Sequence, residues 1–520
     1  MATVGVIGAG IAGLAAAYQL QHHGLSVEVL EASDAVGGVI RSERHEGFLV
    51  EHGPNSLRSS APALERIVQD LGLDAERVLA NDTADTRYVV RDGVPTPLPR
   101  SLGAFLSTDL FSTRAKVRLL AEPFIGRADA AEESVAAFTR RRLGPEVLRY
   151  AVAPFVGGVF ASAPDDLSVQ HAFERLARLE DEYGSLFVGA LRRALSGSDD
   201  DTTDVPSGLF SFRNGLQTLP QARHEALGTA VALNTPVTAA RHDGSQWQVR
   251  VSPPDAPGHT RTFDALLCTA PLHRLEQMTL ETPVDLSPLV DAHYPPLSVL
   301  ALGYPRDAVA HPLDGFGALV PPVEDDLNVL GTIFSSTLFP GRAPDGHVLL
   351  TTFVGGARAP QHATPNPDAL QSLVATDLKR LLGAEGSPVF RHHIHWPHAI
   401  PQYTLGYERV RSRGCTAELR AASGCGAERP ASPPPPEAAS DRWQRATAAH
   451  RGWGWRAAAH GPRPRRWSAA RARRAPARER AWRKRSSLAR SGRPRRGGRG
   501  PQTHRAGAPP RRAGSPAPAR

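Results

Sequence analysis

The stretch that most constrains this chain is Thr3–Ala32, where a short apolar strand leads through a glycine-rich turn into a helix and a second strand. Gly8 allows the tight turn, Gly10 lets a pyrophosphate approach the backbone, and Gly13 lets the helix pack closely on the strand. Glu31 follows the second strand, 21 residues after Gly10, at the spacing of a carboxylate that binds ribose hydroxyls. The sequence therefore predicts an α/β unit that binds a dinucleotide, with the diphosphate at the helix N-terminus.

The remainder of the first 413 residues alternates between strand and helix patterns, with enough apolar residues for two or three domains. Phe263–Pro271 is a continuous apolar run, which predicts a strand buried in a parallel sheet, with Cys268 as a small core residue. Other strands are expected at 48–51, 87–90, 231–233, 237–241, 246–251, 297–303, 316–320, 330–334, 348–354 and 392–396. Helical periodicity predicts helices near 64–71, 113–122, 129–143, 145–156, 168–183 and 368–382.

The composition changes abruptly after Arg413. Residues 414–520 hold 26 of the chain's 61 basic groups and only 5 of its 52 acidic groups, so the preceding part is net acidic. They contain no Val, Ile, Phe or Tyr but five of the seven Trp. Such a segment buries too little apolar surface to offset the entropy of ordering, so we expect a disordered tail. Its Arg/Pro/Ala-rich composition is typical of GC-rich DNA read in a wrong frame; the alternative is an Arg-rich tail that binds nucleic acid.

The expected location follows from what the chain lacks. No run of 18 apolar residues occurs, so no transmembrane helix is expected. The first strand begins at Thr3, which leaves no room for a signal peptide. Three cysteines do not make a disulfide framework, which favours a reducing cytoplasm.

Several stretches together resemble the protoporphyrinogen oxidases of the flavin-dependent amine oxidase superfamily. They are GAGIAGLAAAYQL, LEASDAVGGVIRS, EHGPNS, FSFRNGLQTLP, LGTIFSSTLFPGRAP, LLTTFVGGAR and WPHAIPQY, spread over residues 3–411. The resemblance implies a Rossmann-like FAD-binding domain of the amine-oxidase type, a mixed-sheet substrate domain and a helical membrane-docking subdomain, α/β in class and α+β overall. It implies the six-electron oxidation of a porphyrinogen to a porphyrin in haem biosynthesis, with O₂ as acceptor and hydrogen peroxide as product.

The resemblance also assigns residues to the two ligands. The FAD contacts it implies are Gly8, Ala9, Gly10, Ile11, Ala12, Gly13, Glu31, Ala32, Gly53, Pro54, Asn55, Ser56, Val237 and Trp396. Arg87 is expected to pair with a substrate propionate, Leu319, Ile333 and Phe353 to sandwich the tetrapyrrole, and Gly158 to lie where the backbone approaches it. No catalytic side chain is assigned, because the cofactor carries the oxidation.

On the same basis the chain divides into interleaved parts. FAD-binding segments are expected at 1–86, 209–275 and 396–413, the substrate and helical region at 87–208, the substrate-binding sheet at 276–395 and the tail at 414–520. The chain is expected in the cytoplasm, with peripheral contact to the inner face of the membrane and a homodimer as further expectations. No specific nucleic-acid partner is expected.

Two departures from the family pattern bear on function. Val39 follows Gly37-Gly38 where relatives often have Arg or Lys, and Arg41 is the nearest basic replacement. The C-terminal G-N-x-x-G-V-S-V-x-D-C-I-type segment that caps the flavin ring in the family is missing. The alternatives are therefore an amine oxidase, a carotenoid desaturase, or a flavoprotein fragment without activity.

The lysines bear on the amine oxidase alternative, and the histidines near residue 395 bear on whether the chain binds a metal ion. Lys116 and Lys379 are the only lysines before the tail, and neither is an obvious flavin-facing lysine of the kind found in amine oxidases. The histidines of the segment 392–398 (His392, His393, His395 and His398) have no Cys or carboxylate at ligand spacing, so no metal site is predicted.

Overall fold

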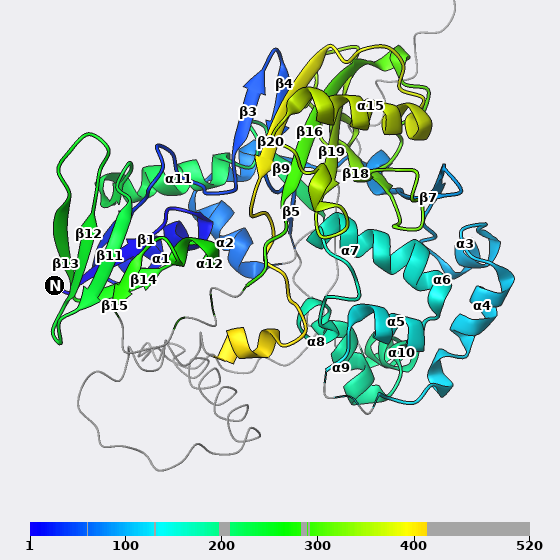
Figure 1. Ribbon diagram of the computed structural model, residues 1–520, viewed down its shortest axis with the longest axis horizontal. Helices are drawn as coiled ribbons and strands as arrows, with labels where there is room; N and C mark the ends of the chain where they lie inside the picture. The colour runs from blue at the N-terminus through cyan, green and yellow to red at the C-terminus, as the bar shows by residue number, and fades with distance from the viewer. Residues whose placement is uncertain are drawn as a thin grey trace, which may run out of the picture. The chain divides into compact units, whose positions relative to one another are not determined.

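The computed structural model describes residues 1–412 except positions 60, 129, 131, 197–207, 282–285, 287–288 and 290–291 (Figure 1). The described residues fall in one compact unit, Met1–Glu428. The expected tail at 414–520 lies outside the described residues. Within the described part of the chain, every helix is too short or too polar to cross a bilayer.

The glycine-rich unit forms as predicted. Strand β1 (Thr3–Ile7) leads into helix α1 (Ile11–His22), and β2 (Ser26–Leu30) returns parallel to β1. β10 (Val231–Ala232) and β14 (Ala265–Cys268) complete a parallel sheet in the order β10-β2-β1-β14. Parallel neighbours separated by over two hundred residues require long crossover connections, and the intervening chain supplies them.

The apolar run Phe263–Pro271 was predicted to be one buried strand, and this is wrong in two respects. Phe263 ends β13 (His259–Phe263), whereas Ala265–Cys268 forms β14 in the parallel sheet. β14 pairs with β1 on one side only among the described residues, so Leu267 and Cys268 are exposed. An edge strand with one free side buries less surface than a central strand, although its sequence is equally apolar.

A second, mixed sheet has the order β13-β12-β11-β15, with β11 (Val237–His242), β12 (Trp247–Val251) and β15 (Thr279–Glu281). Leu30, at the end of β2, packs in one apolar cluster with Phe263 and Val249. The two sheets are thereby joined beside the end of β2, where Glu31 lies.

The largest sheet has seven strands, ordered β20-β16-β19-β18-β17-β7-β8. They are β7 (Arg87–Arg91), β8 (Val94–Pro97), β16 (Leu297–Pro305), β17 (Gly317–Leu319), β18 (Val329–Phe334), β19 (His347–Gly355) and β20 (Phe390–Trp396). The Asp92-Gly93 turn joins β7 to β8, with both residues at positive φ. Helix α15 (Pro367–Leu382) covers one face, where Leu300, Phe334 and Leu378 belong to the main apolar core.

Short elements connect the sheets. They are the hairpin β3 (Ser42–His45) and β4 (Phe48–Glu51), the sheet of β5 (Leu57–Arg58), β9 (Leu209–Phe212) and β6 (Arg77–Leu79), and helices α2 (Pro62–Asp70), α11 (Thr218–Leu227), α12 (Leu272–Leu275) and α14 (Ser335–Leu338). The predicted helix 64–71 corresponds to α2, which ends before Gly72 at φ +65°.

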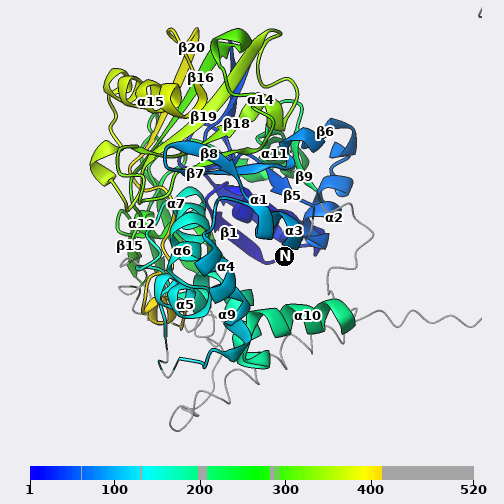
Figure 2. The ribbon, with the colours of Figure 1, turned by 90° about the vertical axis from the view of Figure 1, so that its right-hand side faces the viewer.

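The helices between Leu102 and Ser196 form a group of their own (Figure 2), of which α3 and α10 lie outside the predicted helical segments. They are α3 (Leu102–Ser107), α4 (Thr113–Leu120), α5 (Val135–Arg142), α6 (Pro145–Val147), α7 (Ala153–Phe160), α8 (Val169–Ala172), α9 (Glu174–Tyr183) and α10 (Leu186–Ser196).

Three predicted boundaries in this group need correction. The predicted helix 129–143 starts only at Val135, because Ser134 caps it by accepting a 3.1 Å hydrogen bond from the N–H of Ala137. The predicted helix 145–156 is interrupted by a π turn at Leu148–Val152, just before Pro154, which lacks an N–H. The predicted helix 168–183 breaks at Phe173, whose backbone is not helical.

A buried ion-pair network holds this helical group together. Arg142 of α5 is fully buried and contacts Glu122, also fully buried, at 3.2 Å. Its Nε donates a 2.7 Å hydrogen bond to Glu180 of α9, and a second nitrogen of the same guanidinium also contacts that carboxylate. Glu122 in turn accepts from the hydroxyl of Ser185 at 2.6 Å. Among the described residues, Glu122 therefore has Arg142 as its counter-ion, whereas Glu180 also contacts Arg141 at 2.8 Å.

We expect Arg142→Ala to lower the free energy of unfolding by about 3–5 kcal/mol, because it leaves the fully buried carboxylate of Glu122 without the counter-charge of Arg142. Arg140→Ala is the matched control, since Arg140 lies on the same helix, is 55% exposed and approaches Asp165 only to 3.9 Å. The control is expected to change stability by at most about 0.5 kcal/mol. Urea unfolding followed by far-UV circular dichroism measures both; equal midpoints for the two variants would contradict the role of the network.

Candidate active site

The turn between β1 and α1 is built to receive a phosphate group. Gly8 has φ +99°, and a Cβ on Gly13 would lie 2.0 Å from the carbonyl oxygen of Gly8, so neither position accepts a side chain without strain. Gly10, by contrast, has open space where its Cβ would be. The first hydrogen bond of α1 runs from the N–H of Leu14 to the carbonyl of Gly10. The N–H groups before Leu14 have no partner within the helix, so they face this space. The turn therefore fits a diphosphate at the helix N-terminus.

Glu31 is tied to the same turn. Its carboxylate accepts hydrogen bonds from the N–H of Ala9 at 2.6 Å, and from the N–H and hydroxyl of Ser33 at 2.9 and 2.7 Å. A carboxylate offers about four lone-pair sites, so these bonds fix its orientation and leave acceptor capacity for a ribose hydroxyl. The carbonyl of Glu31 accepts from Thr235 at 2.7 Å, which brings the start of β11, with Val237, to the same place.

Two more glycine-rich loops close around the turn. Gly37 bridges to Gly10 in the parallel sense, and a Cβ on Gly38 would lie 3.5 Å from the Cα of Gly10. A Cβ on Gly53 would lie 2.3 Å from the carbonyl of Val39, so the loop Gly53–Ser56 passes directly beside this segment. The side chain of Val39 is half exposed, and because valine is uncharged it brings no charge to this segment.

Trp396 connects the loop Gly53–Ser56 to the seven-stranded sheet. Its indole Nε1 donates a 3.0 Å hydrogen bond to the carbonyl of His52, although the two residues are 344 positions apart. Within the loop, the side-chain amide of Asn55 donates to the carbonyl of Gly53 at 3.1 Å. The structure thus brings Trp396 and the loop together, whereas Val237 lies beside Glu31.

The residues expected to hold the substrate lie on one face of the seven-stranded sheet. Leu319 is opposite Gly331, and Gly331 is opposite Phe353, so these three form one row across β17, β18 and β19. Arg87, Gly317 and Ile333 form the next row, across β7, β17 and β18. Residues directly opposite each other point to the same face, so Arg87, Leu319, Ile333 and Phe353 share it, and all four are half-buried.

Glycines shape this face. Gly317 and Gly331 contribute no side chain, and a Cβ on Gly317 would lie 2.2 Å from the carbonyl of Thr332. On α7, a Cβ on Gly158 would lie 2.3 Å from Cδ2 of Leu319, so this helix approaches the sheet at Leu319. Gly158 and Leu319 are thus direct neighbours, although they come from different elements. We call this face the platform; it is apolar at Leu319, Ile333 and Phe353, and α7 covers it at Leu319.

Arg87 marks one end of the platform. Its guanidinium lies 5.3 Å from the centre of the Phe316 ring, and its Nη1 donates only to the carbonyl of Asp85, at 3.3 Å. No carboxylate pairs with Arg87 among the described residues, because the Asp85 side chain is bound by Arg100 at 2.7 Å. A half-buried guanidinium without a counter-ion is suited to bind a carboxylate.

Sequence reasoning missed a buried ion pair between the hairpin β3–β4 and the segment after α14. Glu51, at the end of β4, contacts Arg342 at 3.1 Å, and both side chains are almost fully buried. Burial raises the pKa of Glu51 and lowers that of Arg342, although each charge opposes the effect on the other. The pair lines a cavity of about 10 Å³, large enough for one water, which it shares with Asn55 and Ile333. Glu51 begins the stretch EHGPNS, and Arg342 lies in FPGRAP. Both stretches carry the family resemblance, so a charged residue in each could have been identified as a candidate from the sequence.

Comparison with known proteins agrees with this arrangement. The flavin containing amine oxidoreductase family matches residues 11–425. The chain is 38% identical to protoporphyrinogen oxidase 2 of Arabidopsis thaliana, over 78% of this chain and 85% of that protein. It is 30% identical to coproporphyrinogen III oxidase of Bacillus subtilis, over 78% of this chain and 88% of that protein.

Solved structures share the fold. A provisionally assigned protoporphyrinogen oxidase from Exiguobacterium has a TM-score of 0.68 and 21% identity, covering 81% of this chain and 92% of that one. A putrescine oxidase has a TM-score of 0.57 and 18% identity, covering 79% and 90%. The family assigns FAD as the cofactor of this protein. The chain belongs to the flavin containing amine oxidoreductase family.

Proposed function

We propose that this protein oxidises a porphyrinogen, either protoporphyrinogen IX or coproporphyrinogen III, to the porphyrin in haem biosynthesis, with O₂ as the electron acceptor. Relatives with both names match most of the chain. Bound FAD supplies the oxidising chemistry, accepting electrons two at a time, and O₂ returns it to the oxidised form with release of hydrogen peroxide.

The observation that carries this proposal is the platform with Arg87 at its end. Leu319 and Phe353 lie in one apolar row and Ile333 lies in the next, an arrangement that suits a broad macrocycle. Arg87 lacks a carboxylate partner among the described residues. Porphyrinogens combine an apolar ring system with carboxylate side chains. We assign Arg87 to a propionate, Leu319, Ile333 and Phe353 to the ring, and Gly158 to the point beside Leu319 where the backbone approaches the ring.

An amine substrate is the second candidate, and the lysines weigh against it. Lys116 donates its Nζ hydrogen atoms to the carbonyls of Leu106 and Thr108, at 2.8 and 2.7 Å, within the helical group. Lys379 lies near the end of α15, and this helix packs on the opposite face of the seven-stranded sheet from the platform. Neither lysine in the described part of the chain approaches the platform.

We also propose that the helical group touches a membrane surface. Val117 and Leu120 on α4 are 62% and 63% exposed, and the nearby Phe124 is 89% exposed. Leu110 and Phe111, by contrast, are buried, whereas Leu106 is 55% exposed. Exposed Arg114 on α4 adds positive charge beside the exposed apolar residues. Apolar side chains next to basic ones favour binding to anionic lipid surfaces.

The activity assay uses a version of the gene in which the reading frame after codon 413 restores the family's C-terminal segment. We expect porphyrin fluorescence and hydrogen peroxide from at least one of the two porphyrinogens, and no turnover of a polyamine. Turnover of the polyamine alone would refute the proposal. Flavin absorbance per mole of protein, measured on this version and on the 520-residue chain, separates loss of FAD from loss of chemistry; we expect less FAD on the 520-residue chain.

Arg87→Ala is expected to raise KM for the porphyrinogen roughly 10- to 150-fold, since a hydrogen bond to a charged group contributes about 1.5–3 kcal/mol. FAD content is expected to stay the same, because Arg87 lies on the substrate sheet. Arg250→Ala, an exposed strand arginine in the mixed sheet, is the control and should leave KM unchanged. An unaltered KM in Arg87→Ala, or loss of flavin, would count against the assignment.

Replacing Leu120 and Phe124 with Asp is expected to abolish flotation of the protein with anionic phospholipid vesicles, since it puts negative charge on the exposed apolar surface. Val389→Asp is the control, because Val389 is 51% exposed but lies outside the helical group. Equal flotation of both variants would place the membrane contact elsewhere.

A further inference from the structure

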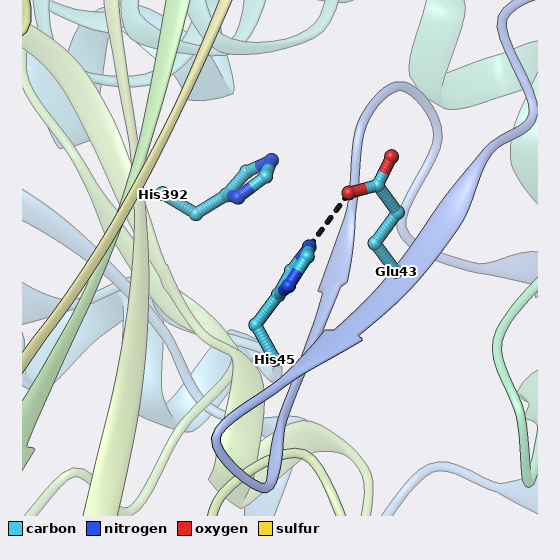
Figure 3. Close-up of side chains that lie close together, drawn as sticks. All are labelled: Glu43, His45 and His392. Atoms are coloured by element: carbon cyan, nitrogen blue, oxygen red, sulfur yellow. Dashed lines mark hydrogen bonds and ion pairs between the residues drawn. The ribbon is translucent and has the colours of Figure 1, made fainter.

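A cluster of three histidines and one carboxylate lies outside the platform and the glycine-rich turn. Glu43 and His45 come from β3, His52 follows β4, and His392 comes from β20 at the edge of the seven-stranded sheet. Figure 3 shows Glu43, His45 and His392 pointing toward one another from these two elements, with His45 bonded to Glu43 at 2.7 Å. His52 Nε2 lies 3.4 Å from the other oxygen of Glu43.

The spacing of the imidazoles matches that of ligands on one metal ion. The ring centre of His392 lies 5.2 Å from the ring centre of His45 and 5.2 Å from that of His52. Two imidazoles bound to Zn²⁺ through bonds of about 2.0–2.1 Å at a tetrahedral angle have ring centres roughly 5 Å apart. Donor atoms of Glu43, His45 and His392 all lie within 4.8 Å of one another. His52 is outside this set of three, so its Nε2, 3.4 Å from Glu43, must move closer to the other donors. His45, with a side chain 49% exposed, has room to rotate toward them.

The side chain of His52 is only 13% exposed, and its Nε2 is a buried nitrogen without a hydrogen-bond partner among the described residues. An unpaired buried nitrogen is costly, and a metal bond would satisfy it.

We propose that Glu43, His45, His52 and His392 bind a divalent transition-metal ion of the Zn²⁺ type. Four protein ligands make a closed site of the structural kind, which leaves no position for a substrate. The ion would join the hairpin β3–β4 to the edge strand β20. It would thereby fix His52, whose carbonyl accepts the hydrogen bond from Trp396, and the loop Gly53–Ser56 that follows. The half-exposed Glu43 and His45 give the ion a path from solvent.

The test is calorimetric titration of the full-length chain with Zn²⁺ after treatment with a chelator, with and without added FAD. We expect one site per chain in both conditions, so the result does not depend on flavin binding. His392→Gln and His45→Gln are each expected to weaken binding at least tenfold. His393→Gln is the matched control: His393 is adjacent on β20 but faces Ser298, with its Nε2 3.4 Å from that hydroxyl, and binding should be unchanged.

A second measurement separates loss of a ligand from loss of folding. Zn²⁺ is expected to raise the urea midpoint of the unaltered chain and of His393→Gln, but not that of His45→Gln, whose exposed side chain is dispensable for folding. Co²⁺ in the same site should give the strong visible absorption of a four-coordinate complex, absent from His392→Gln. Absence of stoichiometric Zn²⁺ binding, or equal weakening by His393→Gln, would overturn the proposal and leave a surface His–Glu ion pair.

Discussion

The buried pair of Glu51 and Arg342 is the interaction on which the two halves of the site depend. Glu51 accepts hydrogen bonds from Ser42 and from the N–H of Leu216, while Arg342 also donates to Ser211 at 2.5 Å. The backbone carbonyl of Arg342 accepts from Leu49 of β4 at 3.0 Å. Two charges removed from water are tolerated only when each keeps its partners, so this network fixes the position of β4 against the segment after α14. Asn55 and Ile333 border the same cavity, so the pair sets the relation of the cofactor loop to the substrate platform.

The seven-stranded sheet then serves two purposes through its two faces. Leu300, Leu302 and Phe334 point to the face covered by α15 and supply the main apolar core. On the opposite face, Gly317 and Gly331 replace side chains that would otherwise fill the space above the sheet. Because strand side chains alternate between faces, the packed core and the open platform come from the same strands. The rigidity of one face therefore positions the residues of the other.

The same sheet positions the histidine cluster at its edge. In the described part of the chain β20 pairs with β16 alone, and the face of β20 that carries His392 meets the hairpin β3–β4, where His392 lies beside His45 and His52. The segment 392–398 was considered as a metal site by itself, but its alternate residues point to opposite faces of β20. His392 finds its partners on a different hairpin, which no local spacing could have indicated.

The sequence by itself determined the units whose contacts are local. The turn from Gly8 to Gly13, the return of β2 and the Asp92-Gly93 hairpin depend on glycine conformations and on neighbours within about thirty residues, so their patterns suffice. The family resemblance identified Arg87 and Phe353 as candidate substrate residues. It did not predict the strand register that places them on one face of the sheet. Tertiary structure alone decided the pairing of β7 with β17, the exposure of Leu267 and Cys268 on β14, and the partners of Glu51 and His392. These depend on residues that are distant in the chain, and whether an apolar strand is central or at an edge is set by its neighbours and not by its own sequence.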